Sequence, residues 1–188
     1  MLTGSQEHYS KDIACDDPYI DGIATSGLLR TSFLPFAMTD PATLHALLLL
    51  SGTHYSRTRG SHSHPIDLLR LQGMAISEIN RALADPSRAT SNALIAAVAQ
   101  MARYEALFGD RDIFNTHMTG LLRIVALRGG LVNLGMDGLL ERLLLWIDAN
   151  TAYFLGGRVY FDPGAYPAST THPRPDPVKF SAGLIRQA

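Results

Sequence analysis

Cysteine and clustered basic residues are both scarce in this sequence, and each scarcity narrows the function. A single cysteine cannot form an internal disulfide framework or a cysteine-only zinc site. That residue, Cys15, precedes two aspartates, whose negative charges disfavour the thiolate that a cysteine nucleophile needs. The formal net charge is −1 and no run of lysine or arginine occurs, so we expect no direct nucleic-acid binding by this chain.

Long apolar segments are also missing. The apolar run at 44–52 is shorter than the ~20 residues that a membrane-spanning helix needs, and no other stretch stays apolar for that length. Residues 1–17 lack the apolar core of a signal peptide. We therefore expect a soluble, intracellular protein that does not contact a membrane.

The residues that are abundant favour helices. Of the 188 residues, 46 % are hydrophobic and 18 % are charged, so the chain can build a sizeable core. Leucine and alanine dominate, whereas valine and isoleucine are sparse, and no strand-like alternation stands out. The sequence predicts an all-α, single multi-helix domain of packed antiparallel helices at 39–157, with an irregular N-terminal arm at 1–38 and an extended, proline-rich C-terminal tail at 158–188.

Cap residues, prolines and glycines divide the predicted domain into five helices. Asp40-Pro41 is a typical helix start, Asp110 and Asp137 can cap later helices, and Gly109 is a helix stop. The predicted helices cover 41 to about 55, 65 to 84, from a cap at Ser87 or Thr90 to 108, 111 to about 128, and 138 to 157. The last is apolar around most of its circumference, which predicts that it is buried.

A glycine-rich stretch between the fourth and fifth predicted helices first suggests a phosphate-binding loop. Gly130 and Gly135 have the spacing G-x-x-x-x-G. A P-loop continues with lysine and serine or threonine and follows a strand, but here Met136 and Asp137 follow, and a helix precedes. We therefore predict a helix end and turn in which Gly129 or Gly130 has a positive φ.

Histidines near the second predicted helix supply an alternative hypothesis. His54, His62 and His64 lie close together in sequence, and with Asp67 they could form the metal site of a metal-dependent enzyme. Their spacing matches no well-known zinc site, and the same residues also suit a solvated loop. His117, near the apolar side of the fourth helix, is interpreted as a buried neutral histidine rather than a catalytic one.

Polar residues on the fifth predicted helix are more informative. By helical rotation Asn150 falls among Leu139, Leu143 and Trp146, so its amide needs partners inside the core. We interpret Asn150 as a buried polar residue that bonds a neighbouring helix or turn, with contact to a ligand as the alternative. No catalytic set of residues is recognised.

The segments 33–56, 117–135 and 139–161 resemble the fungal-specific transcription factor regulatory domain found in zinc-binuclear-cluster regulators. The first is similar to the opening helix of that domain. The others follow its pattern of a helix with H-x-x-G-L that ends in R-G-G, a turn that ends in L-G, and a long helix with W-x-D. The matching residues are His117, Gly120, Leu121, Arg128, Gly129, Gly130, Leu134, Gly135, Trp146 and Asp148.

The resemblance implies a helical regulatory domain in the nucleus, without catalytic residues or cofactors. It implies action through protein contacts, with the transcription machinery or a second copy of the chain, or through a small apolar effector. The six-cysteine cluster of such regulators is absent, so neither zinc nor specific DNA contact can be carried over. The alternatives are the metal-dependent enzyme above and a non-catalytic helical scaffold or truncated relative.

Overall fold

The computed structural model describes residues 7–14, 16–22, 26–59, 65–182 and 184 of the chain, and no strand occurs among them. Five long helices form the body: α4 (Pro41–Arg59), α5 (Pro65–Ala84), α6 (Asn92–Phe108), α7 (Arg111–Leu127) and α8 (Leu139–Leu155). The shorter segments are η1 (Tyr9–Ile13), α2 (Pro18–Asp21), η2 (Leu29–Phe33), α3 (Leu34–Ala37), η3 (Leu131–Asn133) and α9 (Pro177–Phe180). The all-α prediction is confirmed.

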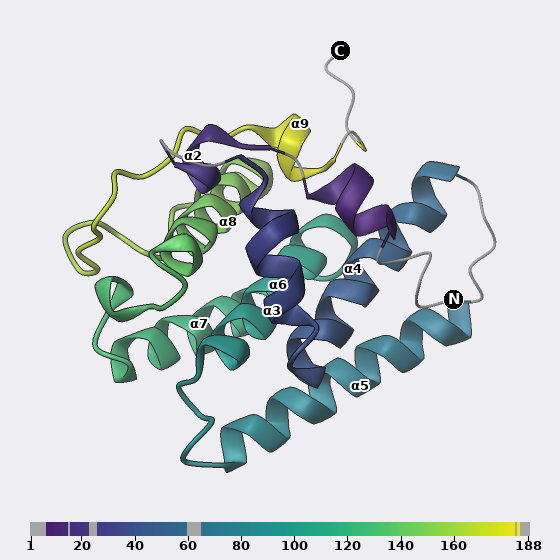
Figure 1. Cartoon of the computed structure of the whole chain (residues 1–188), viewed down its shortest axis with the longest axis horizontal. Helices are drawn as coiled ribbons and strands as arrows, with labels where there is room; N and C mark the ends of the chain where they lie inside the picture. The colour runs from purple at the N-terminus through teal and green to yellow at the C-terminus, as the bar shows by residue number, and fades with distance from the viewer. Residues whose placement is uncertain (1–6, 15, 23–25, 60–64, 183, 185–188) are drawn as a thin grey trace.

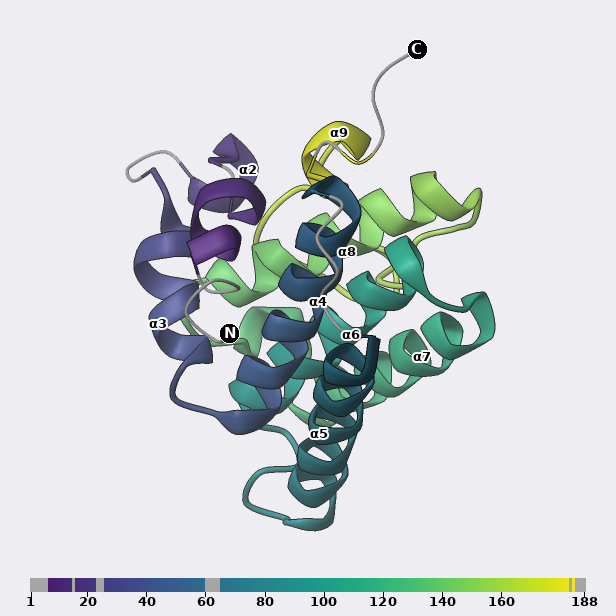
Figure 2. The same ribbon diagram turned by 90° about the vertical axis from the view of Figure 1, so that its right-hand side faces the viewer.

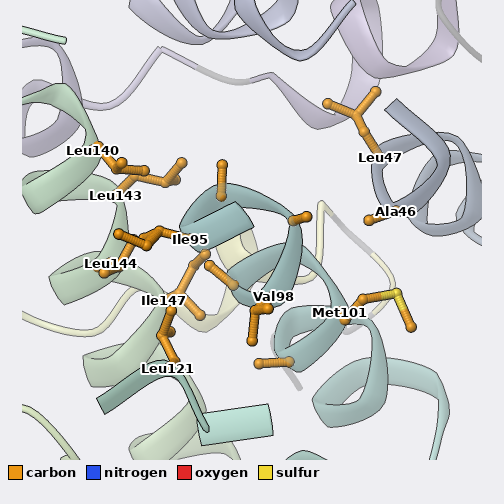
Figure 3. Packing of buried hydrophobic residues seen from close by; sticks show 14 of the residues in the cluster. Ala46, Leu47, Ile95, Val98, Met101, Leu121, Leu140, Leu143, Leu144 and Ile147 are labelled. Atoms are coloured by element: carbon orange, nitrogen blue, oxygen red, sulfur yellow. The ribbon is translucent and has the colours of Figure 1, made fainter. Parts of the chain in front are cut away.

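Helix α6 forms the centre of the fold, where α4, α7 and α8 pack around it (Figure 1). Ile95 and Val98 of α6 face Leu144 and Ile147 of α8 in the core (Figure 3). Because α6 buries residues on all sides, it carries almost no solvent-facing stripe from Leu94 to Arg103. The core is therefore one continuous cluster built around a single helix.

Helix α5 lies at the edge of this body. It packs mainly on α4, and the end of α5 that leads into α6 extends beyond the other long helices (Figure 2). Prolines explain its bounds, because Pro65 occupies the first helical position and Pro86 follows the last turn. Both ends agree with the sequence prediction.

Two of the predicted N-terminal helix caps are confirmed, and two are wrong. The Asp40 carboxylate accepts the amide of Ala42 at 2.9 Å, and Asp110 caps α7 in the same way. Helix α6 is capped by Ser91 rather than Ser87 or Thr90, because residues 85–90 form turns before it.

The expected cap at Asp137 is also wrong. Asp137 and Met136 have φ values of 51° and 64°, and Gly138, which is left-handed as well, immediately precedes α8. No side chain caps α8 at this point. Instead, the backbone at Met136, Asp137 and Gly138 has left-handed φ values and forms the turn that leads into α8. Such values are uncommon for residues other than glycine, asparagine and aspartate.

The described part of the N-terminal arm is helical rather than irregular. Its short segments bury Tyr9 and Ile13 of η1 and Leu29 and Phe33 of η2 in the common core. Within each pair the two residues are four positions apart, so they lie on one face of a helical turn. The arm covers the helical body, and the Arg142 side chain of α8 donates to the carbonyl of Ile20 at 2.8 Å.

The described part of the C-terminal tail contains little helix outside α9, and two buried aromatic side chains anchor it. Phe161 and Phe180 have no exposed surface, and α9 lies against α8. Buried aromatic anchors explain why a proline-rich segment holds one path here. No helix among the described residues is long and apolar enough to cross a membrane.

Candidate functional site

Helix α7 ends at a glycine pair whose backbone satisfies the last carbonyls of the helix. The Gly130 amide donates to the carbonyl of Val125 at 2.9 Å, and the Gly129 amide donates to that of Ala126 at 3.0 Å. This is the Schellman arrangement, which needs a left-handed residue directly after the helix. Gly129 and Gly130 have φ values of 96° and 99°, so the predicted helix end is confirmed and both glycines have a positive φ.

Arg128 and Gly135 fasten the α7–α8 connection to the start of α6. The Arg128 guanidinium donates to the carbonyl of Thr90 at 2.9 Å. The Gly135 amide points at the Asn92 side-chain oxygen at 3.4 Å, and a Cβ on Gly135 would lie 2.2 Å from the Asn92 amide nitrogen. These two residues of the family pattern therefore link the α7–α8 connection to the start of α6, and a side chain at position 135 would displace the Asn92 side chain.

Asp148 of α8 anchors the beginning of the tail. Its carboxylate is fully buried and accepts the backbone amides of Tyr160 at 2.9 Å and Phe161 at 2.8 Å. Burial raises the pKa of Asp148, while the two amide donors act in the opposite direction. The aspartate of the W-x-D pattern thus serves as a structural acceptor for chain that is distant in sequence.

Two further polar residues of α8 bind the rest of the tail. The Asn150 oxygen accepts the amide of Asp176 at 2.7 Å, and its amide nitrogen donates to the carbonyl of Trp146 at 2.8 Å. Glu141, which is buried, accepts both the backbone amide and the hydroxyl of Ser169. Asn150 is fully buried, and both its side-chain oxygen and its side-chain nitrogen have partners within the protein.

Trp146 closes the same region from the core side. It is 1 % exposed and packs against the tilted ring of Phe180 of α9, with ring centroids 5.5 Å apart. The Arg103 guanidinium of α6 lies 5.2 Å from the Trp146 ring and donates to the carbonyl of Phe180 at 2.7 Å. The tryptophan of the pattern therefore helps to fix the end of the tail.

Where α8 ends, the structure contains a pocket of about 400 Å³ that was not predicted from the sequence. It lies between the first turns of α7, the last turns of α8 and the chain that follows α8. The residues that line it are Arg111, Phe114, Asn115, Thr151, Ala152, Leu155, Gly157, Arg158, Val159 and Tyr160.

One wall of this pocket is set by Asp148. The Tyr160 ring packs edge-on against Phe114 with centroids 5.9 Å apart, and its hydroxyl donates to the Asn115 side-chain oxygen at 2.6 Å. Burial and then the Asp148 charge raise the pKa of Tyr160, and Arg111 opposes them. The position of Tyr160 in this wall is thus fixed by three contacts: its amide with Asp148, its hydroxyl with Asn115 and its ring with Phe114.

The comparisons with known proteins agree with this architecture. The family model described as fungal specific transcription factor domain matches residues 8–166. The chain belongs to this family. No curated protein and no solved structure matches the chain. The match begins in the arm and ends in the tail, so the transcription factor domain includes the tail segment that Asp148 holds.

His117 and Gly120 also belong to the family pattern, but among the described residues neither is seen to hold the tail or the α7–α8 connection in the transcription factor domain. His117 is half-buried on α7, and burial lowers its pKa, which favours the neutral ring. At Gly120 no described atom lies within 4 Å of where a Cβ would be, so space alone does not explain this glycine.

The histidine hypothesis receives no support from the part that the structure describes. His54 is 3 % exposed, and its Nδ1 lies 2.8 Å from Nε2 of His8. Its Nε2 donates to the carbonyls of Ser181 and Ala182, each at 3.2 Å. His62 and His64 lie outside the described residues. Asp67 lies in the first turn of α5.

The ring of His54 is therefore occupied on both sides by the protein itself. Burial and then the neighbouring His8 lower the pKa of His54. Among the residues that the structure describes, no group of three or more histidine, cysteine or carboxylate side chains could hold a metal ion. His54 ties the N-terminal arm and the C-terminal end to α4, which is a structural use of its two nitrogens.

Proposed function

We propose that this chain is the regulatory body of a transcription factor and that it acts by contact with other proteins or with a small effector. It performs no catalytic step and makes no DNA contact of its own. The observation that carries the proposal is the family match across the arm, the helices and the start of the tail. The family is regulatory, and a regulatory role in general follows from membership.

The internal use of the polar residues supports a binding role over a catalytic one. The two buried carboxylates and the buried amide of α8 each accept backbone amides of the tail. Acceptors that are already satisfied in this way are poorly suited to general acid–base catalysis, which needs a group within reach of a substrate proton. The pocket at the end of α8 offers a place for a small effector.

The proposal assigns the protein to the nucleus, where its partners are the transcription machinery or a second copy of the chain. Net charge supports the absence of direct DNA contact, because a chain with a formal charge of −1 lacks the basic excess that non-specific DNA binding requires. A DNA-binding module would then come from elsewhere.

A tethered reporter assay tests this proposal. The chain is fused to an unrelated DNA-binding domain in a fungal reporter strain, and expression is compared with that domain alone. We expect the fusion to raise or lower reporter expression. A Leu144→Asp fusion, which places a charge in the core, should have no effect at matched protein levels, and Arg123→Gln, on the exposed face of α7, should behave like the parent.

Two results would contradict the proposal. If the fusion and the DNA-binding domain alone give the same expression, the chain is not a regulatory body. If the purified chain alone binds a specific duplex tightly at ~150 mM salt, the statement on DNA contact is wrong.

A further inference from the structure

The pocket at the end of α8 combines an apolar floor with two cationic side chains. Phe114 is 4 % exposed, and Leu155, Ala152 and Val159 are half-buried around it. Arg111 and Arg158 are exposed lining residues. A volume of about 400 Å³ lies within the usual range for small-molecule sites.

The polar groups that line the pocket are mainly hydrogen-bond donors that remain available. The Asn115 oxygen already accepts the Tyr160 hydroxyl, which leaves the Asn115 amide hydrogens. The Thr151 hydroxyl is committed to the carbonyl of Asp148 at 3.1 Å. Among the described residues, no carboxylate forms an ion pair with Arg111 or Arg158.

No acidic side chain lines the pocket, and two carboxylates of the adjoining elements are directed elsewhere. Asp110 accepts the amides of Asp112 and Ile113, so the first turn of α7 is already capped and its amides do not face a ligand. Asp148 is turned towards the amides of Tyr160 and Phe161 behind the pocket wall. The lining therefore carries positive charge without an internal counter-charge.

We propose that this pocket binds a small monocarboxylate with an apolar body, aromatic or short aliphatic. The guanidinium groups of Arg111 and Arg158 bind the carboxylate, since planar guanidinium matches a planar carboxylate in two parallel hydrogen bonds. The Asn115 amide donates to the same group, and the apolar body packs on Phe114 and Leu155. An apolar floor favours such a ligand over a free inorganic anion. This inference rests on the proposed function, because it names the effector of that regulatory body.

Binding to the full chain tests the proposal, with phenylacetate and hexanoate as probes and phenylacetamide as the neutral isostere of phenylacetate. We expect saturable binding of at least one carboxylate in calorimetry or by protein-detected NMR. Phenylacetamide should bind about tenfold more weakly, since it lacks the charge that the arginines recognise. Inorganic phosphate should not displace the carboxylate.

Arginine variants locate the site. Arg111→Gln and Arg158→Gln should each weaken carboxylate binding about tenfold, and the double variant should abolish it. Arg123→Gln changes the net charge equally on an exposed part of α7 outside the pocket and should leave binding unchanged. Because both lining arginines are exposed, these variants should remain folded, which thermal unfolding verifies.

Several outcomes would overturn the proposal: no saturable binding of either carboxylate, equal binding of phenylacetamide, tighter binding of phosphate, or equal weakening by Arg123→Gln. The two proposals can fail separately. If the tethered chain regulates a reporter but binds neither probe, only the pocket assignment is wrong. If it binds carboxylate but never affects a reporter, the regulatory proposal is wrong.

Discussion

Helices α7 and α8 end in the same way and yet lead into different surroundings. Each stops at a glycine pair, and the second glycine of each pair donates back to the carbonyl of the residue five positions earlier, Val125 in one case and Ala152 in the other. After α7, the buried Leu131 follows the pair, and Arg128 just before it is bound to the carbonyl of Thr90. After α8, the exposed Arg158 follows and lines the pocket.

The difference shows that the same backbone arrangement can lead the chain either into the core or along the surface. At the end of α7, the Arg128 guanidinium donates to a carbonyl of the protein itself, so this end helps to position the helices. At the α8 end the arrangement turns the chain and leaves a guanidinium facing solvent, so this end can contact a ligand. Several residues of the family pattern lie at or just after the end of α7. The proposed ligand contact Arg158 lies just after the end of α8.

The largest expected loss of stability comes from removing the carboxylate of α8 that holds the chain after this helix. Asp148→Ala leaves the amides of Tyr160 and Phe161 without their buried acceptor, so we expect a loss of about 3 kcal/mol in the free energy of unfolding, measured in urea. Asp162→Ala, an exposed carboxylate in the same segment, should cost less than about 1 kcal/mol. A loss at Asp148 no larger than that at Asp162 would show that the tail is not held by this carboxylate.

The next effect compares the two glycine pairs directly. Gly130 has φ 99° and ψ 176°, a region almost restricted to glycine, whereas Gly156 has φ 64° and ψ 39°, which other residues adopt at a cost. No described atom would clash with a Cβ at either position, so the cost is conformational. Gly130→Val should destabilise by about 2 kcal/mol and Gly156→Val by about 1 kcal/mol. Equal stability of Gly130→Val and the parent in urea would contradict the assigned turn.

Local chemistry made much of the fold predictable. Pro65 and Pro86 bracket α5 because proline suits a first turn and cannot continue a helix, and both ends of α5 match the prediction. Asp40 and Asp110 were recognised as caps from the helix pattern that follows them. The prediction of a cap at Asp137 is wrong because aspartate also tolerates a left-handed turn. The pattern of a single sequence does not distinguish a capping aspartate from one in such a turn.

The candidate site was much less predictable. Arg111 and Arg158 are far apart in sequence, and they line one pocket where Tyr160, whose amide Asp148 accepts, packs against Phe114. The course of the chain after α8 depends on tertiary contacts, and no periodic pattern in the sequence indicates them. The one available signal was the second glycine pair followed by arginine, which resembles the first pair with its preceding arginine.

A smaller effect contrasts the arginines at the two helix ends. Arg128→Gln removes a charged hydrogen bond to the partly buried Thr90 carbonyl and should cost about 1 kcal/mol. Arg158→Gln removes no internal bond among the described residues and should change the free energy of unfolding by less than about 0.5 kcal/mol. Comparable losses in urea denaturation would mean that Arg158 has a structural role, and the distinction between the two ends would fail.

The smallest effect concerns acid, to which buried groups on the two helices respond with opposite sign. Burial lowers the pKa of His117 on α7, so between that value and the unfolded value of about 6.5 the unfolded state binds more protons. Stability from this group is complete above pH ~6.5 and is lost as the pH falls below it. Burial raises the pKa of Asp148 on α8, so the folded state binds its proton first, and protonation of this group increases the free energy of unfolding as the pH falls.

These signs can be separated by measuring urea denaturation at several pH values. His117→Gln should flatten the fall in stability just below pH ~6.5, where the histidine titrates, and should leave the more acidic range unchanged. His54 and His45, whose pKa values burial also lowers, remain as a common background in parent and variant. If the variant and the parent lose stability in parallel from neutral pH downwards, His117 is not buried in the neutral form, and the packing assigned to that face of α7 is wrong.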